Sequence, residues 1–304
     1  MNFGARAAVS AMRFVKRLGL FPKPGGTDSE IAKARAYNQK HPYREPSDRK
    51  ARYGTEYIGG YPVLVMKPLE ASRKKAILFL HGGGNKDAWR PEVAFARTYG
   101  KRTGSDVFYP LYPPFTEAPV GKTADLIYAI YEDLAERYEA ENIAVVGGSY
   151  GGFLVMQLIT WINRNGNAVD MPALLIMNSP FALPEMEAEW ALARQYERID
   201  PMFPEGAMRL MLDGILRADP ETPDCALYPG KMDFRRAPET WIFYAEEACA
   251  CVSGAIRKAY ARDGAADRLH MHIEPGMMHC YACAPVFPES KRDFNRQIEL
   301  IRKL

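Results

Sequence analysis

From residue 56 onward, short aliphatic and β-branched runs alternate with longer amphipathic stretches. Leu126, Ile130, Leu134 and their neighbours repeat at spacings of three and four, which predicts a helix. Strand–helix alternation is typical of a mostly parallel sheet covered by helices on both faces. The segments that predict strands are 62–66, 76–80, 106–110, 143–146, 173–177, 240–244 and 269–273.

The first 54 residues do not follow this alternation. Residues 3–18 predict an amphipathic helix with basic residues along it, and 28–39 predict a second helix that Ser29 or Asp28 can cap. The first helix either packs against the protein or forms an interface element that touches lipid or substrate. We therefore expect residues 1–54 to form an N-terminal helical cap segment.

The catalytic α/β domain is expected at 55–304, with one long interruption. About sixty residues separate the strands at 173–177 and 240–244, and they contain two amphipathic helical patterns. This length exceeds a simple crossover connection. We predict a cap-like insertion at about 180–235.

The composition and net charge limit which kinds of molecule the protein is expected to bind. The chain has 304 residues, 47% of them hydrophobic, and a formal net charge of only +3. This suits a globular protein and predicts no nucleic-acid partner. No apolar run approaches the ~20 residues of a membrane span, and no uninterrupted apolar h-region predicts a signal peptide. We expect a cytoplasmic protein, with peripheral lipid contact and a homodimer left open.

The segment 143–152 reads Ile-Ala-Val-Val-Gly-Gly-Ser-Tyr-Gly-Gly, and a helical pattern follows at once. This is G-x-S-x-G between a strand and a helix, the context that a nucleophile elbow requires. Ser149 is therefore the predicted nucleophile. A dinucleotide fingerprint would need glycine at 149, and a P-loop ending in Gly121-Lys122-Thr123 would need glycine at Thr116, so both phosphate-binding motifs fail.

A second glycine-rich segment, His81-Gly82-Gly83-Gly84, ends the predicted strand at 76–80. Acyl transfer generates an oxyanion that backbone N–H groups stabilise, and glycines let the backbone approach the substrate. We expect Gly83 and Gly84 to donate from this loop and Tyr150 to supply a third N–H group. His81 is expected to be structural rather than the general base.

The two motifs together resemble those of the hormone-sensitive-lipase-like esterases of the α/β-hydrolase superfamily. The resemblance covers most of residues 56–304 and extends to 109–113 and 275–279, which are similar to the family's Y-R-L-A-P and G-M-x-H segments, the former with departures. It implies an α/β-hydrolase fold with an eight-stranded sheet, a helical cap, and hydrolysis of short- to medium-chain acyl esters without a cofactor or metal.

The triad order in this fold is serine, acid, histidine. His279 follows the last predicted strand in a glycine-containing loop, whereas His270 and His272 lie within that strand and the other histidines precede Ser149. His279 is therefore the predicted base.

The acid should follow the predicted strand at 240–244, where the family usually has aspartate. This chain has Glu246 and Glu247 instead. Glu247 lies 98 residues after Ser149 and 32 before His279, spacings that resemble the family's. We predict Glu247, with Glu246 as the alternative.

Cysteines cluster beside both triad loops. Cys249 and Cys251 follow the acid candidates, and Cys280 and Cys283 follow the base. They either fill tight packing as small hydrophobic side chains, or form a disulfide or a metal site.

The predicted function is that of a serine carboxylesterase. An amidase or formamidase with the same triad is an alternative. A non-catalytic, ligand-binding hydrolase fold is a third.

Overall fold

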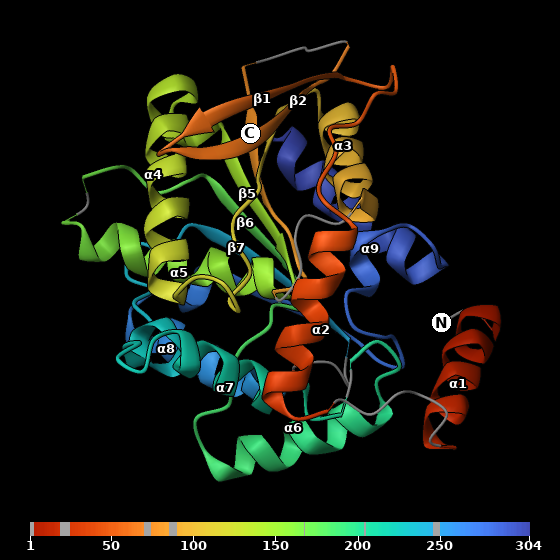
Figure 1. The fold of residues 1–304 in the computed structure, drawn as a ribbon. Helices are drawn as coiled ribbons and strands as arrows, with labels where there is room; N and C mark the ends of the chain where they lie inside the picture. The colour runs from red at the N-terminus through yellow and green to blue at the C-terminus, as the bar shows by residue number, and fades with distance from the viewer. Residues whose placement is uncertain are drawn as a thin grey trace.

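An eight-stranded sheet forms the centre of the molecule (Figure 1). The computed structural model describes residues 3–18, 25–69, 74–84, 90–166, 168–203, 205–245 and 250–304. The strand order is β1-β2-β4-β3-β5-β6-β7-β8, and only the β1–β2 and β2–β4 pairs are antiparallel. The strands are β1 Arg52–Ile58, β2 Tyr61–Lys67, β3 Ala76–Leu80, β4 Asp106–Pro110, β5 Ile143–Gly148, β6 Leu174–Asn178, β7 Glu239–Ala245 and β8 Leu269–Glu274.

All seven strands expected from the sequence are present, and the prediction of a mostly parallel, eight-stranded sheet is confirmed. The strand without a sequence signal is β1. It lies at the edge of the sheet, pairs only with β2, and buries only Ile58. An edge strand that is largely exposed on both faces needs no hydrophobic run, so the pattern did not predict it.

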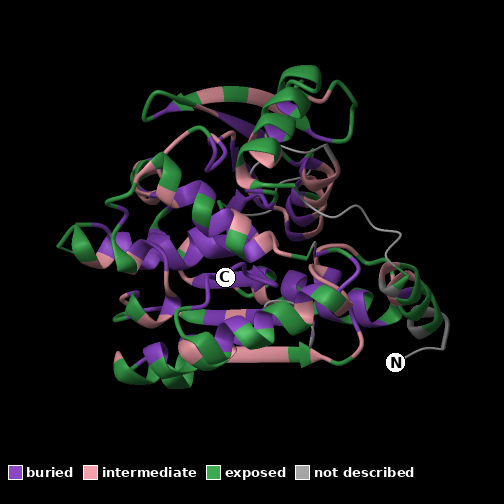
Figure 2. Cartoon of the chain, turned by 60° about the horizontal axis from the view of Figure 1, so that its bottom comes forward, coloured by how far each residue is buried: buried purple, intermediate pink, exposed green. Residues whose placement is uncertain are grey.

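Helices cover both faces of the sheet. Along β3, alternate side chains enter different hydrophobic clusters: Leu78 and Leu80 pack on one face, and Ile77 and Phe79 on the other. The first face is covered by α4 (Val120–Tyr138), α5 (Tyr150–Arg164) and α8 (Ser253–Arg262), and the second by α3 (Arg90–Thr103) and α9 (Pro288–Arg302). The central strands β3, β5 and β6 are buried along their whole length, and α5 is buried over most of its length, so buried residues run through the middle of the molecule (Figure 2).

The N-terminal helices pack against the insertion between β6 and β7. Helix α1 (Phe3–Arg17) contacts α6 (Glu187–Ile199), and α2 (Thr27–Lys40) contacts α7 (Ala207–Ala218). All four helices had been expected near these positions. The prediction that Ser29 or Asp28 is the N-cap residue of α2 was wrong, because the N-cap residue is Gly26. The helix begins one residue before Asp28, so Asp28 and Ser29 lie within its first turn.

Helix α1 places its polar and apolar side chains in an unusual arrangement. Val9 is buried, and Arg13 and Lys16 bond to the body of the protein, whereas Phe14, Val15 and Leu18 are exposed. Within the described ranges, no helix combines the length and hydrophobicity needed to span a lipid bilayer.

Candidate active site

Ser149 lies at the junction between β5 and α5 in a conformation that L-residues rarely adopt. Its φ and ψ are 52° and −118°, and it is the N-cap residue of α5. Its N–H group donates to the carbonyl of Asn178 at 2.9 Å, and its carbonyl accepts from Phe181 at 2.8 Å. These bonds to the last residue of β6 and to the segment that follows it fix the strained turn, which presents the hydroxyl at the N-terminus of a buried helix.

The glycines around Ser149 are required by packing. A Cβ at Gly151 would lie 1.9 Å from the carbonyl oxygen of Leu80, and a Cβ at Gly147 would lie 2.5 Å from the backbone of Gly151. Neither contact can be relieved by rotating a side chain, because the obstacles are main-chain atoms. The glycine pattern read from the sequence therefore reflects the close approach of β3, β5 and α5.

The structure brings His279 to Ser149. The loop after β8 places Nε2 of His279 2.9 Å from Oγ of Ser149, which is hydrogen-bonding distance. Burial lowers the pKa of His279 to about 4, so the imidazole is neutral at neutral pH and Nε2 can accept a proton. The N–H group of the same residue donates to Oδ2 of Asp200 at 2.8 Å.

The two acid candidates, Glu246 and Glu247, lie outside the described residues. The strand before them ends at Ala245, which pairs with Glu274 at the end of β8. Because β7 and β8 are parallel neighbours, the segments that follow them leave the sheet at the same edge.

The glycine-rich loop after β3 lies against the turn that carries Ser149. A Cβ at Gly82 would lie 3.3 Å from Cβ of Ser149, and one at Gly84 would lie 3.1 Å from the ring of Tyr150. Gly83 has a φ of +78°, a conformation that favours glycine. The N–H groups of Gly83, Gly84 and Tyr150 form no hydrogen bond with any residue that the structure describes.

His81 makes structural contacts. Its ring stacks on Tyr112 at a centroid distance of 4.0 Å, and its Nδ1 lies 2.9 Å from the carbonyl oxygen of Gly82. The Tyr112 hydroxyl donates to the carbonyl of His81. Burial lowers the pKa of His81 to about 4, so this ring is also neutral.

No sequence pattern indicated Glu92, which supports the same loop. Its Oε1 accepts the N–H group of Gly82 at 2.8 Å, and burial raises the pKa of its carboxyl group to about 7. Glu92 is the single acidic residue of helix α3, and nothing in its position along the chain marks it as functional. Only the packing of that helix against the loop distinguishes it.

Five aromatic and apolar side chains between residues 181 and 203 are candidates for the wall of an acyl pocket, and two of them lie near His279. The Phe203 ring lies 5.0 Å from the His279 ring, and Phe181 stacks on Phe203 at 6.3 Å. Trp190 packs in the hydrophobic core under Arg209, Tyr196 packs against that core, and Met202 is exposed.

The four cysteines that the structure describes do not converge on one point. Both Cys280 and Cys283 lie beside Gly148, whereas Cys251 is buried near Glu189. Cys225, Cys251 and Cys283 are free thiols. Cys249 lies outside the described residues. Among those that the structure describes, no three cysteines share a site that could hold a metal ion.

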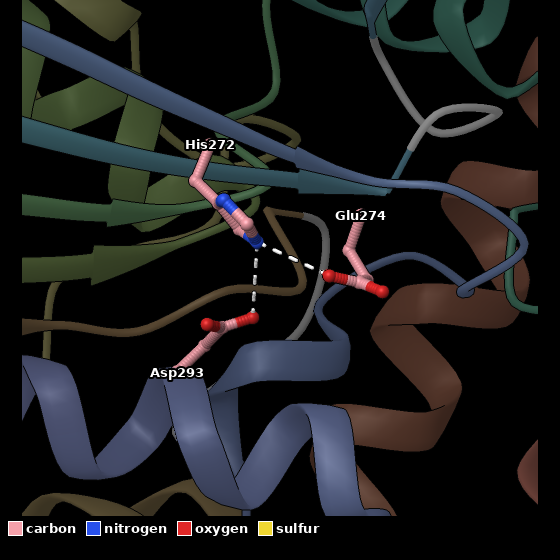
Figure 3. Close-up of side chains that lie close together, drawn as sticks. All are labelled: His272, Glu274 and Asp293. Atoms are coloured by element: carbon pink, nitrogen blue, oxygen red, sulfur yellow. Dashed lines mark hydrogen bonds and ion pairs between the residues drawn. The ribbon is translucent and has the colours of Figure 1, made fainter. Parts of the chain in front are cut away.

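One group of described residues has the spacing of a metal site: His272, Glu274 and Asp293 (Figure 3). Arg292 is close to all three. Its Nη2 lies 3.1 Å from Nε2 of His272, 2.5 Å from Oε2 of Glu274 and 2.8 Å from Oδ2 of Asp293. The guanidinium thus supplies the positive charge that the carboxylates need, and the group is an ion-pair network.

The arrangement of the sheet and the elbow defines an α/β hydrolase, and comparison with known proteins agrees. A family model described as alpha/beta hydrolase fold matches residues 77–283, and the chain belongs to this family. The resemblance indicated by the two glycine-rich motifs is thus confirmed at this level. A search of curated protein sequences gives no match.

Solved structures of esterases and lipases share the fold. An esterase/lipase from an uncultured bacterium is 18% identical over 97% of both chains, with a TM-score of 0.77. An esterase from the bacterial hormone-sensitive lipase family is 20% identical over 97% of both chains, with a TM-score of 0.76. A hormone-sensitive lipase from a metagenome library is 19% identical over 100% of this chain and 98% of that chain, with a TM-score of 0.75.

Proposed function

We propose that the protein is a serine carboxylesterase that hydrolyses short- to medium-chain acyl esters. The observation that carries the proposal is the 2.9 Å contact between Nε2 of His279 and Oγ of Ser149. This contact lies beside the glycine-rich loop at 81–84, and the N–H groups of Gly83 and Gly84 form no hydrogen bond with any described residue. The structural neighbours named as esterases and lipases support the same class of reaction.

In the proposed mechanism, neutral His279 accepts the proton of Ser149 as the hydroxyl attacks the ester carbonyl. The imidazolium then donates that proton to the leaving alcohol, which leaves an acyl-enzyme. Water, deprotonated by His279, attacks the acyl-enzyme and releases the acid. No cofactor or metal takes part in these steps.

The N–H groups of Gly83, Gly84 and Tyr150 are the proposed oxyanion hole. Glu92 supports this assignment, because it engages the N–H group of Gly82 and leaves the next two glycines to face the substrate. Donors fixed in this way stabilise the developing negative charge without reorganising in the transition state.

Glu247 is the proposed triad acid, with Glu246 as the alternative. The support is topological: both residues follow β7 directly, at the edge where the loop of His279 leaves β8. A carboxylate at this position orients the imidazole and stabilises its protonated form.

We propose that the helices before β1 and the insertion between β6 and β7 together form a cap over this site. Phe203 supports the idea, because it comes from the insertion and packs on His279. An apolar wall of Phe181 and Phe203 suits an acyl chain. A series of 4-nitrophenyl esters from acetate to decanoate measures the preferred chain length.

The decisive experiment is Ser149→Ala. We expect ester hydrolysis to fall by at least about 10⁴-fold, with an unchanged melting temperature, because the hydroxyl is the nucleophile. A fluorophosphonate probe should label the wild type and not the variant. Wild-type turnover by the variant would remove the proposal. Chromogenic amides matched to the esters test the amidase or formamidase alternative, and absence of labelling in the wild type would favour the non-catalytic one.

We further infer a cytoplasmic location, which the free thiols of Cys225, Cys251 and Cys283 support.

A further inference from the structure

A buried carboxylate joins the insertion to the loop of the base. Asp200 follows α6 directly and has no exposed surface. Its Oδ1 accepts the N–H group of Met202 at 2.8 Å, and its Oδ2 accepts the N–H group of His279 at 2.8 Å. One side chain therefore fixes both its own turn and the main chain of His279.

Helix α1 also bonds to the turn at residues 197–203, which contains Asp200. Lys16 Nζ donates to the carbonyl oxygens of Glu197, Asp200 and Phe203. Arg13 Nη2 donates to the carbonyl oxygen of Met277, two residues before His279, at 3.1 Å. The turn at 197–203 and the loop at 277–279 are thus joined directly by Asp200 and also through helix α1, which is remote from both in the sequence.

The chemistry of this contact requires a carboxylate. Both oxygens of Asp200 accept, each from a different main-chain N–H group. Asparagine has one acceptor oxygen and one NH₂ group, so one of the two N–H groups would face a donor. An isosteric change therefore breaks one of the two bonds inside a buried site, where an unpaired donor is costly.

We propose that Asp200 is a positioning residue for the reaction: by fixing the main chain of His279, it holds Nε2 within reach of the Ser149 hydroxyl. This inference rests on the proposed function. It assigns the insertion a role in catalysis that is separate from contact with the acyl chain. Since a displacement of about 1 Å can cost about 100-fold in rate, a small shift of this loop is sufficient for a large effect.

The test compares Asp200→Asn with Glu197→Gln. Glu197 is a matched control, because it is also buried, lies three residues earlier, and accepts two main-chain N–H groups at 2.8 Å, from Gly206 and Met208. Its partners belong to the insertion, so its loss destabilises the same region without touching the loop of His279.

We expect Asp200→Asn to lower kcat about 10- to 100-fold with KM within about twofold, and to slow fluorophosphonate labelling of Ser149 similarly. Glu197→Gln should lower the melting temperature by a comparable amount and leave kcat within about twofold. The inference is overturned if both variants have the same kcat, or if Asp200→Asn changes only KM.

Two further variants keep the outcome interpretable. If Asp200→Asn does not yield folded protein, Asp200→Glu retains two acceptors but places them one methylene farther out. It should lower kcat at unchanged KM, and a wild-type kcat would overturn the inference. Ser149→Ala distinguishes the two proposals: an active Ser149→Ala removes the proposed function, whereas an inactive one with fully active Asp200 variants removes only the role of Asp200.

Discussion

At the scale of single residues, the site depends on two opposing influences on His279. Burial lowers the pKa of the imidazole to about 4, which keeps it neutral and able to accept a proton. A triad carboxylate opposes this shift, because it stabilises the protonated ring. The acid limb of the pH profile therefore reports on the acid residue.

We expect kcat/KM to fall as the pH drops through a value below 6.5, since only the neutral ring is a base. Replacing the triad acid with glutamine should move that fall to lower pH, towards about 4, because the protonated ring loses its stabilising charge. The same change should reduce kcat by up to about 10⁴-fold, which is the effect of losing the carboxylate in a Ser-His-Asp triad. The pH–rate profiles of Glu247→Gln and Glu246→Gln are measured side by side, and each variant serves as the control for the other. A larger effect of Glu246→Gln would reassign the acid.

Glu92 gives a second prediction at this scale. Glu92→Ala frees the N–H group of Gly82 and should lower kcat about tenfold or more, because the loop of the oxyanion hole loses its anchor. Glu92→Gln keeps an oxygen acceptor and should remain within about threefold of the wild type. Steady-state kinetics at pH 8 measure both. Equal activities of the two variants would contradict an anchoring role.

At the scale of elements, the ends of parallel strands bring the site together. Ser149 follows β5. His279 follows β8, which lies three positions farther along the sheet than β5. The loop of His279 is also held by contacts between the residues that follow it and helix α9. Tyr281 in the short helix η6 (Tyr281–Cys283) donates to Asp293 on α9 at 2.8 Å, and His272 and Glu274 on β8 join the same network.

Asp293→Asn should lower the free energy of unfolding by about 1–3 kcal/mol at pH 7, because a buried acceptor of several hydrogen bonds is lost. Although burial opposes the shift, bonds from His272, Arg292 and Tyr281 lower the pKa of Asp293 to about 2. A lowered pKa adds stability above about pH 3.8 that is lost as the pH falls towards 2. Denaturant unfolding of both proteins at pH 7 and pH 3 measures this. A difference that grows on acidification would contradict it.

At the scale of the whole molecule, α1 both bonds to the segment between β6 and β7 and presents an apolar surface. Its cations Arg13 and Lys16 bond inward, and Phe14 and Leu18 are 63% and 57% exposed. Exposed apolar side chains on one end of a helix are suited to a lipid surface or to a second copy of the chain.

We expect the lipid surface to be the partner of this face. Phe14→Ser with Leu18→Ser should weaken co-sedimentation with anionic phospholipid vesicles about tenfold or more, since each side chain contributes about 1.5–3 kcal/mol when buried. Tyr57→Ser is the matched control, because Tyr57 is 74% exposed and belongs to the edge strand β1, which lies far from α1 (Figure 1). If instead light scattering shows that the variants dissociate a dimer, while vesicle binding is unchanged, the face is a subunit interface.

The sequence by itself determined the sheet and the tight turn that carries Ser149. Buried parallel strands must be continuous apolar runs, and a tight strand–helix turn must contain glycine, so both requirements are local and visible in the residues. Strand β1 was not predicted, because an exposed edge strand does not need a continuous apolar run. The position of His279 after the last strand was visible through the order of motifs.

Only the tertiary structure decided which polar groups serve those motifs. Glu92 and Asp200 are ordinary acidic residues in amphipathic patterns, and each acquires its role by bonding a main-chain N–H group from a distant loop. The inward bonds of Arg13 and Lys16 arise in the same way. Such contacts depend on how elements pack across tens or hundreds of residues, and neither periodicity nor spacing encodes that information.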